Sequence, residues 1–185
     1  MINSLFFSFI NINSAFLDRI IHKLMVQSEK VREVIFLKYG FDRIDGRDVP
    51  QMVIDDDFTI HGKHSGTVHV ERGTLTIQGE LRGTLDVQSE AKVIIVGKQH
   101  GTVSVNDDAE VIVFGELHGT TNVSAYGTVI VEAHGKLAGT LHNNGVVIVK
   151  GVFGGAQSGN GNLILEENGY IKQPTVKDGI NYYEW

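Results

Sequence analysis

Cysteine is absent from this 185-residue sequence, and proline occurs only twice. Without cysteine there are no disulfides and no thiol chemistry, as is common in cytoplasmic proteins. The two prolines, Pro50 and Pro174, lie on either side of residues 51–173. Because proline removes a hydrogen-bond donor from a strand, its absence from this interval favours a continuous sheet.

Basic charge and long apolar runs are also scarce. The net charge is −6 and the pI is about 5.7, whereas nucleic-acid-binding domains are generally basic. We therefore expect no nucleic-acid partner. No apolar run is long enough to span a bilayer, and residues 1–13 lack the positive start and extended apolar run of a secretory signal. We expect a cytoplasmic location, with membrane association as an option.

A pair of glycines four residues apart recurs six times through the middle of the chain. Threonine follows the second glycine in five of the six repeats, and successive first glycines are 16 to 20 residues apart. The pairs are Gly62/Gly66, Gly79/Gly83, Gly97/Gly101, Gly115/Gly119, Gly135/Gly139 and Gly151/Gly155. Repetition at a short, nearly fixed period is typical of stacked-repeat folds.

A second pattern lies between successive glycine pairs. A small residue precedes two branched apolar residues at alternate positions, as in Ala109, Val111 and Val113. This period of two predicts strands rather than helices. We therefore expect an all-β fold, a parallel β-helix or β-solenoid of about six coils with three short strands per coil.

These patterns divide the chain into three parts. Residues 1–50 are expected to form an N-terminal helical segment and connector. Residues 51–173 contain the β-solenoid, and residues 174–185 form an aromatic C-terminal tail or cap.

Within the first part, Ser14 is a suitable N-cap for a helix that ends near Tyr39, before Gly40. Its apolar residues fall mostly at helical spacing and form one stripe. Residues 40–57 are rich in aspartate, and we expect an acidic connector there, with the coils beginning at about residue 58.

Both ends of the chain carry apolar residues that allow two interpretations. The segment from Leu5 to Ile10 is either a frayed end or a contact with a membrane surface or a protein partner. The tail from Tyr170, with Tyr182, Tyr183 and Trp185, is either a cap over the last coil or a contact surface for a partner.

One outward-facing column of residues is expected to carry alternating charge. It consists of the residue that follows each first glycine: Lys63, Glu80, Lys98, Glu116 and Lys136. In stacked coils these side chains are direct neighbours, so opposite signs favour the stacking of one coil on the next.

A second outward-facing column is apolar. Its isoleucines each lie between two inward-facing positions, so they must point outward; they are Ile94, Ile112, Ile130, Ile148 and Ile164, and Phe114 widens the face. An apolar stripe of this length is expected to be covered. We consider the N-terminal helix of the same chain as the cover, or alternatively a second copy or another partner.

The sequence offers little that could carry out chemistry. His100 and His118 are expected to stack on the outer surface, but no third metal ligand accompanies them. No pair of nucleophile and base and no phosphate-binding loop is recognisable, and the acidic residues are spread over the coils. We therefore expect no enzymatic activity, no metal and no cofactor.

The repeat resembles that of the bactofilins, a family of polymer-forming bacterial cytoskeletal proteins. The residues that carry the resemblance are Gly79–Val87 (GELRGTLDV) and Gly97–Val105 (GKQHGTVSV), and the likeness covers roughly residues 58–165. It implies a right-handed, triangular β-helix that assembles end to end without nucleotide, often near a membrane. The long N-terminal segment and the aromatic tail depart from the short flanks of that family.

Two functions are compatible with these features. The first is a self-assembling structural scaffold that associates with itself end to end or laterally. The second is a monomeric protein-binding module, for example an immunity protein that neutralises a bacterial toxin.

Overall fold

The structure of the protein is a computed structural model that describes residues 38–183. The chain divides into two units, Met1–Gly40 and Phe41–Trp185, and every strand of the described residues belongs to the second. The helix predicted from Ser14 to Tyr39 falls almost entirely outside the described residues. The segment from Leu5 to Ile10 lies wholly outside them.

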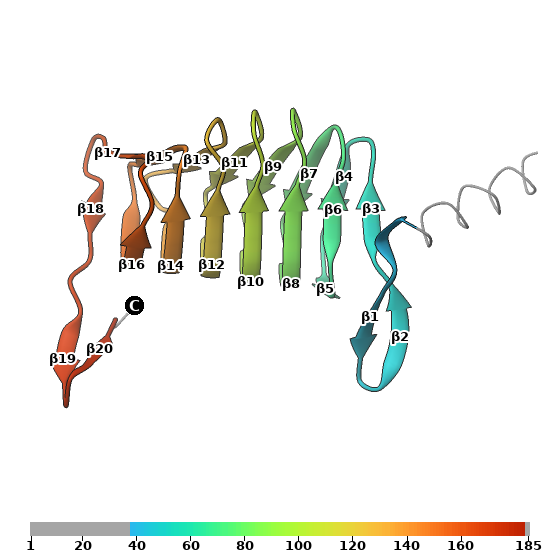
Figure 1. Cartoon of the computed structure of the whole chain (residues 1–185), viewed down its shortest axis with the longest axis horizontal. Helices are drawn as coiled ribbons and strands as arrows, with labels where there is room; N and C mark the ends of the chain where they lie inside the picture. The colour runs from blue at the N-terminus through green and yellow to red at the C-terminus, as the bar shows by residue number, and fades with distance from the viewer. Residues whose placement is uncertain (1–37, 184–185) are drawn as a thin grey trace, which may run out of the picture. The chain divides into compact units, whose positions relative to one another are not determined.

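The second unit is a parallel β-solenoid of about seven turns, whose strands lie side by side in Figure 1. One sheet contains β3 (Met52–Ile54), β5 (Lys63–Ser65), β6 (Val68–Val70), β8 (Glu80–Val87), β10 (Lys98–Val105), β12 (Glu116–Val123), β14 (Lys136–Asn143), β16 (Val152–Ser158) and β18 (Tyr170–Ile171). The other contains β4 (Phe58–Ile60), β7 (Thr74–Ile77), β9 (Lys92–Ile95), β11 (Glu110–Val113), β13 (Thr128–Val131), β15 (Val146–Val149) and β17 (Asn162–Leu165). We call them the nine-stranded and the seven-stranded sheet.

An antiparallel hairpin flanks the solenoid at each end. The first consists of β1 (Phe41–Ile44) and β2 (Arg47–Pro50), and the second of β19 (Thr175–Lys177) and β20 (Ile180–Tyr182). The expectation of an acidic connector over residues 40–57 is therefore wrong. These residues form the first hairpin and the first strand of the solenoid, which adds a coil to the six that were expected.

Each long strand turns a corner at a glycine. In β8 the buried residues Leu81, Leu85 and Val87 share one alternation, which is interrupted only by the half-buried Gly83. Gly83 has a φ of 139°, a conformation that residues with a Cβ rarely adopt. Each complete coil therefore has three faces, but they come from one bent strand and one straight strand rather than from three separate strands.

Successive coils stack without any shift in register, and the glycines make this possible. Gly101 pairs with Gly83 on one side and with Gly119 on the other. At the other glycine column, a Cβ on Gly115 would lie only 2.0 Å from the carbonyl oxygen of Gly97. Strands in a sheet are about 4.8 Å apart, and at this corner that spacing leaves no room for a side chain.

The inward-facing side chains form one continuous apolar core. The predicted inward pairs Val93/Ile95, Val111/Val113 and Val129/Val131 are all 0% exposed. Three buried polar residues interrupt the core: Gln99, Thr121 and Asn143. The core is filled by side chains over its whole length, so the coils hold one another through burial of apolar surface.

The stacked glycines lead to a prediction about stability. We expect Gly115→Ala to lower the free energy of unfolding by at least about 2 kcal/mol, because the added methyl group collides with the Gly97 carbonyl. Gly62→Ala is the matched control, since Gly62 occupies the same place in the first coil and a Cβ there meets no atom within 4 Å. Chemical denaturation of both variants tests this, and equal losses would contradict the close packing at the corner.

Candidate interaction surfaces

The outer surface of the seven-stranded sheet carries the predicted isoleucine column. The pairing of β9, β11, β13, β15 and β17 aligns Ile94, Ile112, Ile130, Ile148 and Ile164. The first four are half-buried, and Ile164 is 40% exposed. Val96 and Phe114 lie beside the column and are 50% and 49% exposed. We call these seven residues the isoleucine face.

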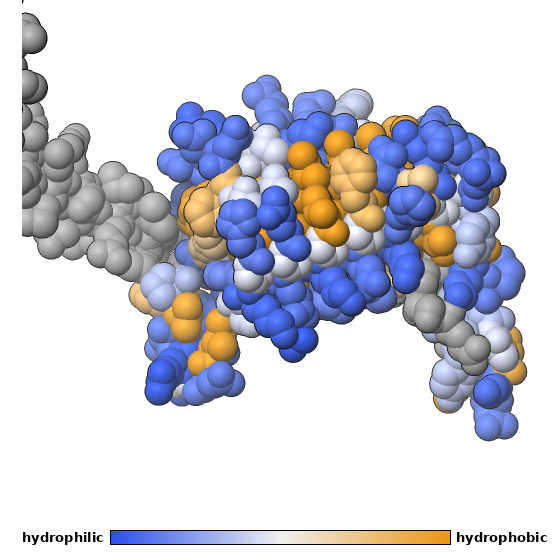
Figure 2. Space-filling model, turned by 180° about the vertical axis from the view of Figure 1, so that it is seen from behind, coloured by the Kyte–Doolittle hydropathy of each residue, from blue (hydrophilic) through white to orange (hydrophobic). Residues whose placement is uncertain are grey.

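Figure 2 shows this side of the molecule, with hydrophobic residues gathered in the middle of the surface and hydrophilic residues around them. The outward direction predicted from the sequence is therefore what the structure has. Among the described residues, no segment covers the exposed half of Val96 or of Phe114. A role for this face in binding stays a prediction.

The last coil exposes side chains that are buried in every earlier full coil. Leu165 occupies the position of Val149, and Ile171 that of Phe153. Val149 and Phe153 are at most 1% exposed, whereas Leu165 is 48% and Ile171 is 37% exposed. Tyr170, at 51%, and the half-buried Leu163 complete this patch, which we call the C-terminal end surface.

The aromatic tail forms the hairpin of β19 and β20. Val176, Ile180 and Tyr182 on this hairpin are 63%, 57% and 47% exposed, and Tyr183 is partly buried. Trp185, the remaining predicted contact residue, lies outside the described residues. The choice between a cap and a partner contact for this tail stays open.

At the opposite end of the solenoid, hydrogen bonds to Asp42 of β1 attach the first hairpin to the solenoid. Its carboxylate accepts hydrogen bonds from the backbone N–H and the hydroxyl of Thr67, the latter at 2.9 Å, and from Gln51 Nε2 at 3.1 Å. The same carboxylate lies beside Gly66. In the later coils the carbonyl oxygen of the preceding glycine takes this position, as the Gly66 carbonyl does beside Gly83. Asp42 thus replaces the acceptor of a coil that does not exist.

Burial by itself raises the pKa of Asp42, but the hydrogen bonds from Thr67 and Gln51 outweigh it. The pKa of Asp42 therefore lies below its ordinary value of 3.8. The attachment continues beyond Asp42: Gln51 Oε1 lies 2.9 Å from His69 Nε2, and His69 Nδ1 lies 3.2 Å from Asp86 Oδ2. Both ring nitrogens of His69 therefore have a polar partner in this attachment.

The predicted charge column is confirmed on the nine-stranded sheet. Its five members are paired coil to coil, Lys63 with Glu80, Glu80 with Lys98, Lys98 with Glu116, and Glu116 with Lys136. Glu116 Oε2 is 3.0 Å from Lys98 Nζ, and its Oε1 is 3.6 Å from Lys136 Nζ. The hydrogen bond from Lys98 is the largest cause that lowers the pKa of Glu116 from its ordinary value of 4.5.

The predicted histidine stack is also present. The rings of His100 and His118 lie 5.2 Å apart between centroids and are inclined by 19°. Burial is the largest cause that lowers the pKa of His118 from its ordinary value of 6.5. In the part of the chain that the structure describes, no three His, Asp or Glu side chains are placed to share a metal ion.

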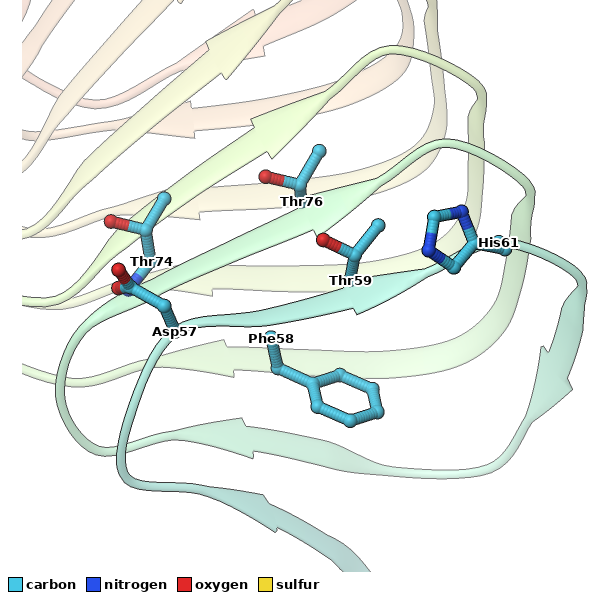
Figure 3. Close-up of a pocket in the computed structure, with 6 residues that line it drawn as sticks. All are labelled: Asp57, Phe58, Thr59, His61, Thr74 and Thr76. Atoms are coloured by element: carbon cyan, nitrogen blue, oxygen red, sulfur yellow. The ribbon is translucent and has the colours of Figure 1, made fainter. Parts of the chain in front are cut away.

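A shallow cleft of about 440 Å³ lies at the start of the seven-stranded sheet. Thr59, Thr74 and Thr76 line it from one side of β4 and β7, whereas Phe58 points to the opposite side (Figure 3). The carboxylate of Asp57 accepts a hydrogen bond from the Thr74 N–H at 2.8 Å. Asp57 thus already binds the neighbouring strand, and we assign no chemistry to this cleft.

Comparison with known proteins adds no family assignment. No family model matches the sequence, and no curated protein or solved structure matches it significantly. The likeness to bactofilins thus rests on the repeat alone. Between residues 38 and 183, no helix has both the length and the apolar character needed to cross a membrane.

The attachment at Asp42 predicts a pH-dependent effect. Asp42→Asn should lower the free energy of unfolding by about 1–2 kcal/mol at pH 7, because the amide cannot accept all three hydrogen bonds. The folded-state pKa is depressed, so this contribution is complete above the unfolded value near 3.8 and is lost as the pH falls through the folded value. Denaturation at several pH values, with hydrogen exchange at the Thr67 amide, measures the effect.

The exposed Asp48 on β2 provides the control for this experiment. Asp48→Asn should leave both the stability and the exchange of the Thr67 amide unchanged. An Asp42→Asn effect of the same size at pH 7 and at pH 2 would argue against a charged attachment.

The charge column predicts an effect that depends on salt. Glu116→Lys places three lysines in consecutive coils and should cost about 1 kcal/mol or less, and the loss should shrink as salt is added. Glu116→Gln, which removes the attraction without adding repulsion, should cost less than Glu116→Lys. Thermal melts at low and high ionic strength test both variants, and a loss that ignores salt would show that electrostatics is not its cause.

Proposed function

We propose that this protein is a non-enzymatic scaffold that assembles through the end of its β-solenoid, as a bactofilin-like cytoskeletal protein. The single observation that carries the proposal is the C-terminal end surface. Leu165 and Ile171 continue the core columns of the preceding coils but have no coil stacked on them. The right-handed winding and the end-to-end assembly of the bactofilins belong to the same proposal.

The chemistry of this end favours association. Burial of the exposed parts of Leu163, Leu165, Tyr170 and Ile171 is worth on the order of 5 kcal/mol as an upper estimate. β17 and β18 are also the terminal strands of their sheets, and terminal strands offer backbone groups for pairing with another chain. A second coil end of the same kind provides both an apolar surface and a strand edge.

The two ends of the solenoid are not equivalent, which bears on the geometry of assembly. At the N-terminal end Ile54 and Ile60 are buried, and Asp42 supplies the missing acceptor at the corner. We therefore expect two C-terminal ends to meet across a two-fold axis, a contact in which both copies use the same surface.

The test is the double variant Leu165→Asp with Ile171→Asp, compared with the wild type by sedimentation velocity over a range of concentrations. We expect the wild type to form larger species as the concentration rises, and the double variant to lose the end contact. Val176→Asp on the exposed hairpin is the control and should assemble like the wild type. Negative-stain microscopy should show particles joined through their ends in the wild type and the loss of these end contacts in the double variant.

Because both altered residues are exposed, the double variant should keep its melting temperature. Unchanged assembly of a folded double variant would overturn the proposal. So would a wild type that remains a single particle at every concentration.

The attachment at Asp42 favours a second candidate, a monomeric protein-binding module such as an immunity protein. A terminated end limits growth, and the exposed residues Val176, Ile180 and Tyr182 offer an apolar contact. Single particles at every concentration would support this alternative.

A further inference from the structure

On the isoleucine face, the two adjacent coils that contain β9 and β11 carry different residues at equivalent positions, and these residues complement each other. Val96 and Phe114 are its most exposed members, and they occupy equivalent places, since the Val96 N–H bonds to the Ile77 carbonyl and the Phe114 N–H to the Ile95 carbonyl. Ile94 and Ile112 pair directly within the same two strands, β9 and β11.

The other margin of these two strands carries opposite charges. Lys92 pairs with Glu110, and their Nζ and Oε2 atoms lie 2.6 Å apart. Both side chains remain accessible, at 39% and 35% exposure. The outward residues therefore read Lys, Ile, Val from the start of β9 to the residue after it, and Glu, Ile, Phe over the same positions of β11.

We propose that the isoleucine face binds the same face of a second copy of this chain, with the two solenoids antiparallel. A two-fold axis parallel to the strands and midway between β9 and β11 exchanges the two strands. It places Lys92 opposite Glu110 of the second copy. In the same way Ile94 faces Ile112, and Val96 faces Phe114, so opposite charges and apolar groups meet on both sides of the axis.

Three other two-fold arrangements of the same faces lack this match. An axis that passes through β11 places Glu110 opposite itself, and like charges across an interface are unfavourable. An axis between β11 and β13 places Phe114 opposite Glu132. A parallel arrangement places Lys92 opposite Val96. The residues of β9 and β11 thus favour this register over these three arrangements. An axis between β13 and β15, which places Glu132 opposite Lys150, leaves residues 92 and 110 unmatched, so the charge variants described below separate the two registers.

The size of the face fits a weak, reversible dimer. The seven strands, at about 4.8 Å spacing, extend over roughly 29 Å, and five residues of a strand cover roughly 16 Å. The two copies together bury on the order of 1,000 Å², which is the lower end of the range for specific interfaces. The dimer should therefore dissociate on dilution.

The charge pair allows a test that separates this contact from loss of stability. We expect Lys92→Glu alone and Glu110→Lys alone to weaken dimerisation more than tenfold, because each places like charges across the axis. An equal mixture of the two variants should recover a mixed dimer to within about threefold of the wild-type affinity. Within each chain the pair stays broken, so recovery on mixing reports only on contacts between copies.

The experiment uses the full chain with Leu165→Asp and Ile171→Asp in every sample, so that assembly through the C-terminal end surface does not contribute. Analytical ultracentrifugation gives the dimer affinity. Lys98→Glu is the control: it breaks an ion pair of the same kind on the nine-stranded sheet and should leave dimerisation unchanged.

Three results would overturn the proposal. The first is a protein that stays monomeric at all concentrations, as it would if residues 1–37 or another partner occupied the isoleucine face. The second is a dimer that ignores both charge reversals, and the third is a mixture that fails to recover. None of these results bears on the C-terminal end surface, so failure here is distinguishable from failure of the proposed function.

Discussion

The close stacking of backbone on backbone at the glycine corners is the constraint on which the rest of the structure depends. A Cβ at Gly97 would lie 2.0 Å from the Gly79 carbonyl oxygen, and one at Gly101 would lie 2.2 Å from that of Gly83. These contacts lock each coil to the previous one without slip, so every outward position becomes a straight column. The alternating charges and the aligned isoleucines follow from that register, because a shift of one residue would reverse which side chains face the core.

The repeat made most of the solenoid predictable, but not its first coil. Strands Met52–Ile54 and Phe58–Ile60 lack the glycine pair, and the structure explains why. A Cβ on Gly62 would meet no atom within 4 Å, since no earlier coil packs against this corner. From Gly79 onward each first glycine packs against a backbone carbonyl of the preceding coil, whereas β3 and β4 come before the first pair, Gly62/Gly66. Counting glycine pairs therefore missed one turn.

The candidate surfaces were predictable to different degrees. Outward columns follow from alternation, which is why the place of Ile112 could be predicted. The C-terminal end surface could not, because Leu163 and Leu165 fit the inward pattern as well as Val147 and Val149 do. Only their place in the last coil exposes them. Asp42 stood among other aspartates, and nothing local marked it as the one that reaches Thr67. If both proposed contacts form, each two-fold, they can alternate along a chain of copies, so growth continues without a contact through the N-terminal end.

The corners between the sheets absorb all of the variation in the length of the repeat. Two residues join β11 to β12, whereas four join β13 to β14, and strands on both sides still pair residue for residue. At the other corner, two residues join β14 to β15, whereas four residues join β12 to β13 in the preceding coil. Insertions and deletions are thus confined to the edges of the solenoid. The corner at Ala133 and His134, both exposed, is accordingly a natural place to graft a loop or a peptide epitope while every face keeps its pattern.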